Sequence, residues 1–257
     1  FGYKVIGPEI GDMACGEFGE GKMTEPVEIV RQIENYFISL NQNKKFKALV
    51  TAGPTYEYID PVRFISNKSS GKQGFELAKA LSQKGFDTTL ISGPTNLKAD
   101  KDINLIKVET ADQMFNATQY SLPTDVAIFS AAVADFKISK RKVQKIKKED
   151  YLNLNFEKNI DILSYVSNHN SLRPKLVIGF AAETHNVKNN AIKKLTEKNC
   201  DWIIANDVSN QSIGFNSDLN EVDIFYKNKE INDETLAMKK KSEISNEIVD
   251  RVINQLN

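Results

Sequence analysis

Two serines and a glycine stand just ahead of a segment with helical periodicity, an arrangement suited to binding phosphate. They are Ser69, Ser70 and Gly71, and the apolar helical pattern runs from 75 to 84. A helix N-terminus offers unpaired backbone N–H groups and the positive end of the helix dipole. Serine hydroxyls add donors, and glycine lets a ligand approach the backbone. Glycine-rich helix starts are also common where no phosphate binds, so this segment alone favours a phosphate site only weakly.

Lysines recur at spacings that would place pairs of them on one face of an element. Lys194 and Lys198 are four residues apart in a helical pattern and would share a face of that helix. Lys145 and Lys147 would share a face of a strand. Solvated charged surfaces produce the same spacings, so both pairs fit either a phosphate site or an ordinary exposed face.

Alternating strand-like and helix-like segments predict the scaffold that would position these residues. The predicted strands are 47–52, 88–91, 104–108, 126–130, 176–180 and 202–205, and the predicted helices are 75–84, 111–120 and 187–198. A late hairpin is predicted around 227–229, and Ser242 is expected to cap a final helix. This alternation predicts a Rossmann-like three-layer α/β sandwich with a mostly parallel sheet and a late β-hairpin.

Four of the predicted strands end in small or polar residues. These ends are 51–53, 130–132, 179–180 and 206–207. Ligands of open α/β sheets bind beyond the carboxyl ends of the strands. We therefore expect these four ends to meet in one crevice.

The chain divides by composition into three parts. Residues 1–40 comprise a glycine-rich stretch over 1–30 without strand or helix periodicity and a predicted helix over 26–40. Residues 41–46 are expected to form a polar linker, and residues 47–257 the main domain. The chain begins with Phe1 rather than Met, so we expect a piece of a longer protein.

Composition and charge exclude several classes of protein. Lys+Arg and Asp+Glu each number 34, so the basic excess typical of nucleic-acid binders is absent. Cys15 and Cys200 lie far apart, and His169 and His185 have no partner at metal or triad spacing. No apolar run approaches the roughly 20 residues of a membrane span. We expect a cytoplasmic protein with small-molecule ligands and no nucleic-acid or membrane partner.

A dinucleotide-dependent oxidoreductase is the main alternative for such a fold. That class uses a tight Gly-x-Gly-x-x-Gly turn after the first strand and a carboxylate after the second. Here Gly53 and Gly71 are far apart, and the second strand ends at Ser92, Gly93 and Pro94. NAD binding is therefore the weaker interpretation, and a nucleotide-binding module without catalysis is the third.

Eight short motifs in a fixed order resemble phosphopantothenate–cysteine ligase domains. They are 51–55, 59–67, 69–74, 130–135, 145–148, 179–184, 205–208 and 215–218, so the resemblance extends over about 46–257. Departures from the family pattern are Ile160, where proline is common, and Tyr56, where a basic residue is common.

The resemblance implies a two-step ligation. The carboxylate of 4′-phosphopantothenate attacks the α-phosphate of CTP, which releases pyrophosphate and leaves an acyl-cytidylate. The amine of cysteine then displaces CMP. Because an anionic carboxylate approaches an anionic triphosphate, Mg²⁺ and cationic side chains are required. CTP, rather than the ATP of some relatives, and a homodimer are further implications of the resemblance.

The resemblance also assigns roles to single residues. Lys145 matches the lysine that acts on the nucleotide during activation, and Asn67 matches the residue tied to turnover of the acyl intermediate. Arg63 would bind the substrate phosphate, although a structural ion pair explains it equally well. Asp135 matches a nucleotide-binding aspartate that could hold Mg²⁺. The remaining nucleotide-binding positions are Ser69, Ser70, Gly71, Ile160, Asp161, Ile162, Leu163, Phe180, Lys194 and Lys198.

Residues 11–23 carry a second resemblance, to the last active-site segment of flavin-dependent phosphopantothenoylcysteine decarboxylases. In bacteria that domain usually precedes the ligase domain in one chain. Cys15 matches its catalytic proton donor. The resemblance implies that FMN belongs to the missing part of the decarboxylase domain, and that this chain alone neither binds FMN nor decarboxylates.

Overall fold

The computed structural model describes residues 5–12, 16, 18–41, 46–147, 153–209 and 217–257. It divides the chain into two units, residues 1–45 and 46–257. The first unit comprises the antiparallel strands β1 (Glu9–Asp12) and β2 (Phe18–Lys22) and the helix α1 (Pro26–Asn41). The two strands were not predicted because their glycines and charges give no alternating apolar pattern. Cys15 lies outside the described residues.

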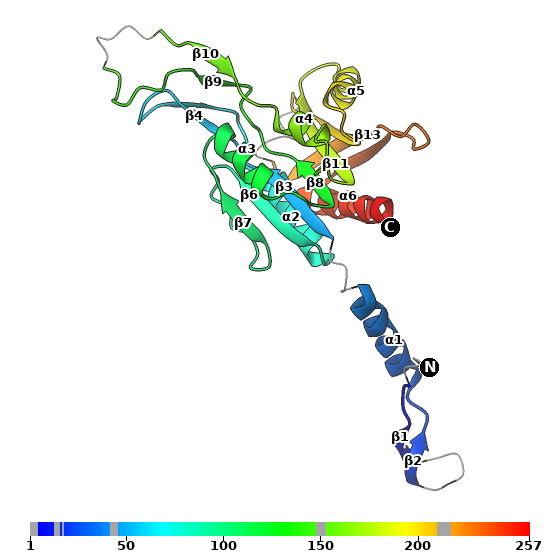
Figure 1. The fold of residues 1–257 in the computed structure, drawn as a ribbon. Coiled ribbons are helices and arrows are strands. Elements are labelled where there is room, and N and C mark those ends of the chain that lie inside the picture. Colours follow the sequence, from blue (N-terminus) through cyan, green and yellow to red (C-terminus); the bar gives the residue numbers. More distant parts are fainter. Residues whose placement is uncertain (1–4, 13–15, 17, 42–45, 148–152, 210–216) are drawn as a thin grey trace. The chain divides into compact units, whose positions relative to one another are not determined.

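An eight-stranded sheet forms the centre of the second unit (Figure 1). Its strands are β3 (Lys47–Ala52), β6 (Asp87–Ser92), β7 (Asn104–Lys107), β8 (Val126–Phe129), β11 (Leu176–Glu183), β12 (Trp202–Asp207), β13 (Leu219–Tyr226) and β14 (Glu234–Lys240). Their order is β14-β13-β12-β11-β8-β3-β6-β7. The six strands from β12 to β7 are parallel, and the hairpin β13–β14 adds to the β12 edge in antiparallel fashion. The Rossmann-like prediction with its late hairpin is confirmed, and the strand order reverses between β3 and β8.

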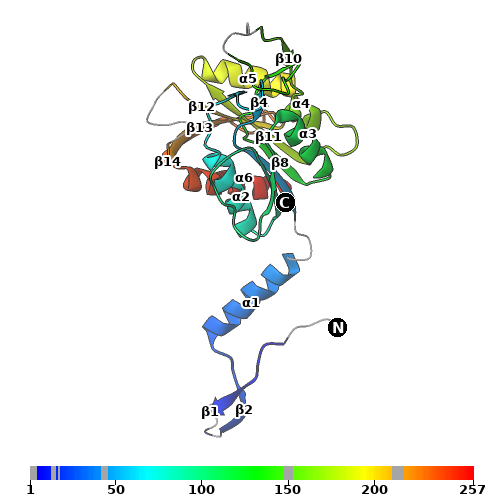
Figure 2. The same cartoon turned by 90° about the vertical axis from the view of Figure 1, so that its left-hand side faces the viewer.

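Helices cover both faces of this sheet. They are α2 (Lys72–Gln83), α3 (Ala111–Tyr120), α4 (Ile162–Ser167), α5 (Val187–Lys198) and α6 (Lys241–Leu256). α2 and α6 lie side by side on one face (Figure 2), and α3, α4 and α5 pack on the other. Successive strand residues point to opposite faces. Val50 and Ile178 therefore join the core under α2 and α6, whereas Leu49 and Val177 join the core on the other side.

Two helix starts differ from the prediction. α2 begins at Lys72 rather than at 75, because Gly71 has a left-handed backbone (φ 77°) that ends the preceding loop. The prediction that Ser242 caps the last helix is wrong, because β14 runs directly into α6 and Lys240 is the N-cap. The Lys240 backbone N–H donates to the Glu243 carboxylate at 3.0 Å, so a first-turn glutamate takes the capping role.

Two small antiparallel pairs occupy segments for which the sequence predicts no strand. β4 (Tyr56–Tyr58) pairs with β5 (Phe64–Ser66), and β9 (Phe136–Ile138) pairs with β10 (Phe156–Lys158). Each strand has three residues, which is too short for a period of two to be recognised. Residues 141–147 form no strand, so the strand face suggested for Lys145 and Lys147 is not present.

Candidate functional site

A cavity of about 760 Å³ lies at the carboxyl ends of the parallel strands, and we call it the strand-end cavity. Thr51 at the end of β3, Ser130 after β8, Phe180 in β11 and Asn206 in β12 all line it. The expected meeting of four strand ends is thus observed. Its volume lies within the range of about 300–1,000 Å³ that is usual for small-molecule sites.

Hydrogen bonds join the ends of β3 and β8, where the strand order reverses. The Ser130 hydroxyl donates to the Thr51 carbonyl at 2.8 Å. Further on, the Ala134 N–H donates to the Thr55 hydroxyl at 3.0 Å. Thr55 is fully buried. These bonds hold the segment after β8 alongside the segment after β3. Residues of the segment after β8 and Thr51 of β3 therefore lie together in the cavity wall.

The first turn of α2 packs unusually close to both strands. A Cβ atom on Gly74 would lie 2.5 Å from the Ala52 Cβ and 2.6 Å from the Ser130 hydroxyl oxygen. Only glycine allows this approach. The N-cap of α2 is Gly71, and residues 71–74 line the cavity, so a ligand bound there would meet the positive end of the helix dipole.

A network of side-chain hydrogen bonds holds the first turn of α2 in place. Asn206 donates to Asn220 at 3.4 Å, and Asn220 donates to Gln73 at 3.1 Å. Gln73 in turn donates to the Ser245 hydroxyl of α6 at 2.9 Å. Asn220 and Ser245 are buried. Because buried amides require partners, this network ties the start of α2 to β12, β13 and α6.

The strand-end cavity is basic although the whole chain has no net charge. Among its described lining residues six are lysines and two are aspartates: Lys68, Lys72, Lys158, Lys194, Lys198 and Lys241, with Asp135 and Asp161. A concave surface lined by one sign of charge attracts ligands of the other sign. The cavity is therefore suited to a polyanion such as a nucleotide phosphate.

Ion pairs hold the two α5 lysines at the cavity wall. Lys194 pairs with Glu183 of β11 at 2.8 Å. Lys198 pairs with Asp161, whose carboxylate also accepts the Ser164 N–H at 2.9 Å and caps α4. Their ammonium groups are partly exposed, so an incoming phosphate can share them with the carboxylates.

Most of the predicted site residues come together in this cavity. The residues that line it are Asn67, Ser69, Ser70, Gly71, Asp135, Ile160, Asp161, Ile162, Leu163, Phe180, Lys194 and Lys198. The Asn67 amide nitrogen donates to the Val133 carbonyl at 3.0 Å, so its side chain is held on the segment after β8. Asp135 is exposed at the rim.

Lys145 and Arg63 are not among the lining residues of that cavity. Arg63 instead pairs with Asp60 at 2.7 Å, which is the structural ion pair that the sequence left open. Asp60 is fully buried and also accepts the N–H groups of Val62 and Ile146. Burial raises the pKa of the Asp60 carboxyl, but these backbone bonds and Arg63 outweigh it and lower the pKa to about 2. The bond from the Ile146 N–H to Asp60 therefore also fixes the backbone next to the exposed Lys145.

Several cavity residues were missed by sequence reasoning. Lys72 and Gln73 lie inside the motif 69–74, yet only its first three residues had been assigned. Lys241 and Asn220 enter the cavity from the far end of the chain. Nothing local marks them, because their role depends on the packing of α6 and β13 against α2.

The described parts of the chain contain neither a ready-made cluster of metal ligands nor a membrane-spanning helix. There, no three His, Cys, Asp or Glu side chains group in a way that could hold a metal ion. Cys200 is buried, and that burial raises the pKa of its thiol to about 12, so it remains protonated. No helix in those parts is both long and apolar enough to span a bilayer.

Comparison with known proteins gives consistent matches. The family described as DNA/pantothenate metabolism flavoprotein C-terminal domain matches residues 43–256. The coenzyme A biosynthesis bifunctional protein CoaBC of Haemophilus influenzae is 41% identical over 256 residues, which is 99% of this chain and 63% of that protein. The protein of the same name from Vibrio cholerae is 43% identical over 230 residues, or 88% of this chain and 57% of that protein. The chain thus spans less than two thirds of these curated relatives.

A solved structure extends the likeness to three dimensions. The crystal structure of the C-terminal domain of a coenzyme A biosynthesis bifunctional protein CoaBC superposes with a TM-score of 0.68 at 35% identity. The superposition covers 82% of this chain and 96% of that one.

Proposed function

This chain belongs to the DNA/pantothenate metabolism flavoprotein C-terminal domain family, and on that premise we propose that residues 46–257 are a phosphopantothenate–cysteine ligase domain of coenzyme A biosynthesis. The observation that carries the proposal is the lysine-rich cavity at the strand ends, with the start of α2 in its wall. Such a site suits a reaction in which a carboxylate must approach a triphosphate.

The proposed substrates are CTP, 4′-phosphopantothenate and cysteine. The carboxylate of phosphopantothenate attacks the α-phosphorus of CTP, pyrophosphate leaves with the electron pair of the broken bond, and an acyl-cytidylate remains. The amine of cysteine then displaces CMP and loses a proton to form the amide. We assign the base and ribose to Phe180 and to residues 160–163, and the phosphates to the start of α2 with Lys194 and Lys198.

Asn67 is assigned to the acyl intermediate. Its amide nitrogen is held by the carbonyl of Val133, so the side chain has a fixed position at the cavity wall. A neutral amide can orient an acyl group by hydrogen bonds without adding charge beside the phosphates.

Mg²⁺ is proposed as the metal of the reaction, and the residues present fit it. Asp135 offers an exposed carboxylate in the cavity lining. In nucleotide sites Mg²⁺ is held by one or two carboxylates together with oxygens of the substrate phosphates. When bound, the ion neutralises phosphate charge, and Asp135 would fix its position.

Lys145 is assigned to the activation step on the family resemblance alone, because its exposed side chain does not line the cavity. Replacing it by glutamine removes the charge but keeps most of the length. We expect Lys145→Gln to abolish pyrophosphate release, while Lys140→Gln, a nearby exposed control, should leave the rate unchanged. Normal turnover by Lys145→Gln would refute the role.

A homodimer is proposed through the two small antiparallel pairs. β4 contacts β9, and the pairs extend together from the sheet (Figure 1). Val62, Phe64, Phe136 and Phe156 on and beside them are between 44% and 58% exposed. Large apolar side chains gathered on one surface are typical of protein interfaces.

Residues 1–40 are proposed to be the end of a flavin-dependent decarboxylase domain. The curated relatives are called bifunctional and are longer than this chain. FMN, and the proton donor that Cys15 resembles, would belong to that domain in the longer protein. We propose that the ligase works in the cytoplasm.

Pyrophosphate release is the test of the ligase proposal. The chain is incubated with 4′-phosphopantothenate, Mg²⁺ and either CTP or ATP, with and without cysteine. We expect release that requires phosphopantothenate, prefers CTP and continues over many turnovers only with cysteine. Binding of CTP without any release of pyrophosphate would instead favour a nucleotide-binding module. Oxidation of NADH, when NADH is supplied to the chain, would favour the oxidoreductase alternative.

A further inference from the structure

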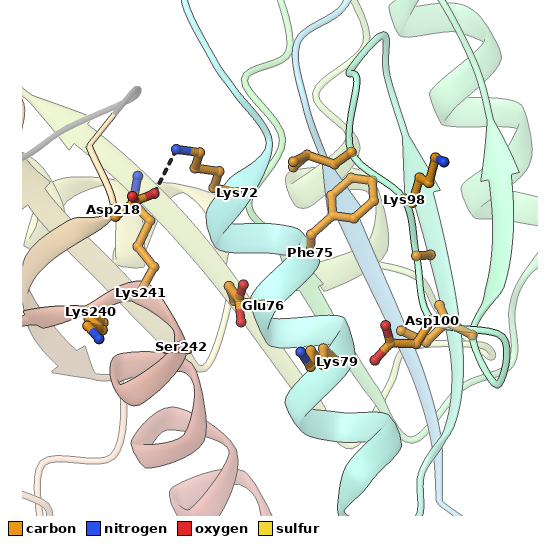
Figure 3. A pocket seen from close by; sticks show the side chains of 13 residues that line it. Lys72, Phe75, Glu76, Lys79, Lys98, Asp100, Asp218, Lys240, Lys241 and Ser242 are labelled. Carbon is orange, nitrogen blue, oxygen red and sulfur yellow. Dashed lines mark hydrogen bonds and ion pairs between the residues drawn. The ribbon is translucent and has the colours of Figure 1, made fainter.

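A smaller cavity of about 450 Å³ adjoins the strand-end cavity, and we call it the side cavity (Figure 3). Lys72, Lys79, Asp218 and Lys241 are among the residues that line it. Lys72 and Lys241 line both cavities. In Figure 3 their side chains extend toward Asp218 from the first residues of α2 and α6.

The fold brings these three residues together by contacts between elements that are far apart in the chain. Gln73 and Ser245 are 172 residues apart, yet their hydrogen bond joins the first turns of α2 and α6. The Lys241 backbone N–H donates to the Asp218 carbonyl at 2.9 Å, which fixes Asp218 beside α6. Lys72, Lys241 and Asp218 are therefore brought together by contacts between α2, α6 and the residues just before β13.

The charges of this group favour an additional anion. Lys72 pairs with Asp218 at 2.7 Å, and the Asp218 side chain is 83% exposed. Lys241 is only 6% exposed. Burial, and then the neighbouring ammonium of Lys72, lower the pKa of Lys241 to about 8, while Asp218 opposes that shift. The formal charges of these three side chains sum to a positive charge beside the first residue of α2, where the positive end of the helix dipole lies.

We propose that Lys72 and Lys241, with Asp218 as a displaceable counter-ion, bind the β- and γ-phosphates of the nucleotide and therefore the pyrophosphate that leaves. The inference rests on the proposed use of a nucleoside triphosphate. The two lysines line the strand-end cavity at the first residues of α2 and α6. Phe180 and residues 160–163, to which the nucleoside is assigned, line the same cavity.

This location gives the two lysines a task in the chemical step. When the carboxylate oxygen bonds to the α-phosphorus, the bond from phosphorus to the bridging oxygen breaks, and pyrophosphate keeps the electron pair. Negative charge grows on the leaving group at that moment. Fixed cations beside it stabilise that charge without rearranging, which is the usual source of electrostatic catalysis.

Titration of the full chain with inorganic pyrophosphate, CTP and CMP, without phosphopantothenate, tests the proposal by calorimetry. Methionine in place of lysine keeps the length and removes the charge. We expect Lys241→Met and Lys72→Met each to weaken pyrophosphate and CTP at least tenfold, with CMP affinity within twofold of the unchanged chain. Lys79→Met, in the side cavity only, should change none of these affinities.

Asp218→Asn provides a variant with the opposite expected sign. Removing the counter-ion should strengthen pyrophosphate binding severalfold, whereas general damage to the region would weaken it. If one of the two lysine variants shows no cooperative urea transition and is therefore unfolded, the same titrations are made with the other variant.

Unchanged pyrophosphate binding in the folded lysine variants would overturn the proposal, as would an equal loss of CMP or an equal effect of Lys79→Met. The titration requires no turnover. A chain that makes no product, yet binds pyrophosphate through Lys241, would overturn the ligase proposal and support this site.

Discussion

Replacing Lys241 by methionine should stabilise the unliganded protein, although the same change removes a binding group. The lysine is 6% exposed, and its pKa falls from 10.5 to about 8 on folding. A tenfold change in proton affinity corresponds to about 1.4 kcal/mol. Keeping this ammonium charged in the fold at pH 7 therefore costs on the order of 3 kcal/mol. Water in the adjoining cavities screens part of this cost, so we expect a gain of roughly 1–3 kcal/mol in the variant.

The pH dependence follows from the direction of the shift. Below pH 8 the lysine is charged in both the folded and the unfolded state, and the whole cost is present. Between pH 8 and 10.5 the folded state loses the proton first, so the stability of the original chain rises relative to the variant. The charged groups that act on the pKa of Lys241 are Lys72 of α2, which lowers it, and Asp218 before β13, which raises it. The advantage of Lys241→Met should therefore be greatest near neutral pH and shrink toward pH 10.5.

Urea unfolding at pH 7 and pH 9.5 measures this difference. Trp202 is the single tryptophan and is 4% exposed in β12, so its fluorescence reports on residues 46–257. Lys79→Met is the control, because Lys79 is exposed on α2, and a change there should stay within about 0.5 kcal/mol. A variant less stable than the original chain at pH 7, or a difference that does not shrink at pH 9.5, would refute the reasoning.

Three further predictions concern packing, acid stability and assembly. Gly74→Ala should cost about 1–3 kcal/mol in urea unfolding and weaken CTP binding, because the new Cβ would lie 2.5 Å from the Ala52 Cβ; an unchanged midpoint would contradict the close packing. Asp60→Asn should lower stability at pH 7 and flatten its pH dependence, because the original carboxylate stabilises the fold above its unfolded pKa of 3.8 and loses that effect as pH falls toward 2. If the stability of both chains fell in the same way as the pH is lowered, the stabilising role of the Asp60 carboxylate would be contradicted. Light scattering should give twice the chain mass for the original protein and a monomer for Phe156→Lys, while a monomeric original chain would count against the proposed dimer.

Long elements of the main domain could be predicted because their patterns are local. The apolar runs at 47–52 and 126–129 are buried on both faces, and the helix over 187–198 repeats at helical spacing. The four strand ends followed from the same reasoning, because parallel strands with crossover helices bring their carboxyl ends to one edge. Shorter elements such as β4 and β9 have too few residues for any period to be read.

The sequence by itself determined the fold class, the position of the crevice and, through its ordered motifs, the family. Only the tertiary structure decided which charges share that crevice. Lys72 and Lys241 meet because α2 and α6 pack side by side on one face of the sheet, a contact between residues about two thirds of the chain apart. The structure also shows that Arg63 pairs with Asp60, three residues earlier, and that Lys145 does not line the cavity. Burial and ion pairing depend on contacts between distant segments, and such contacts leave no local periodicity in the chain.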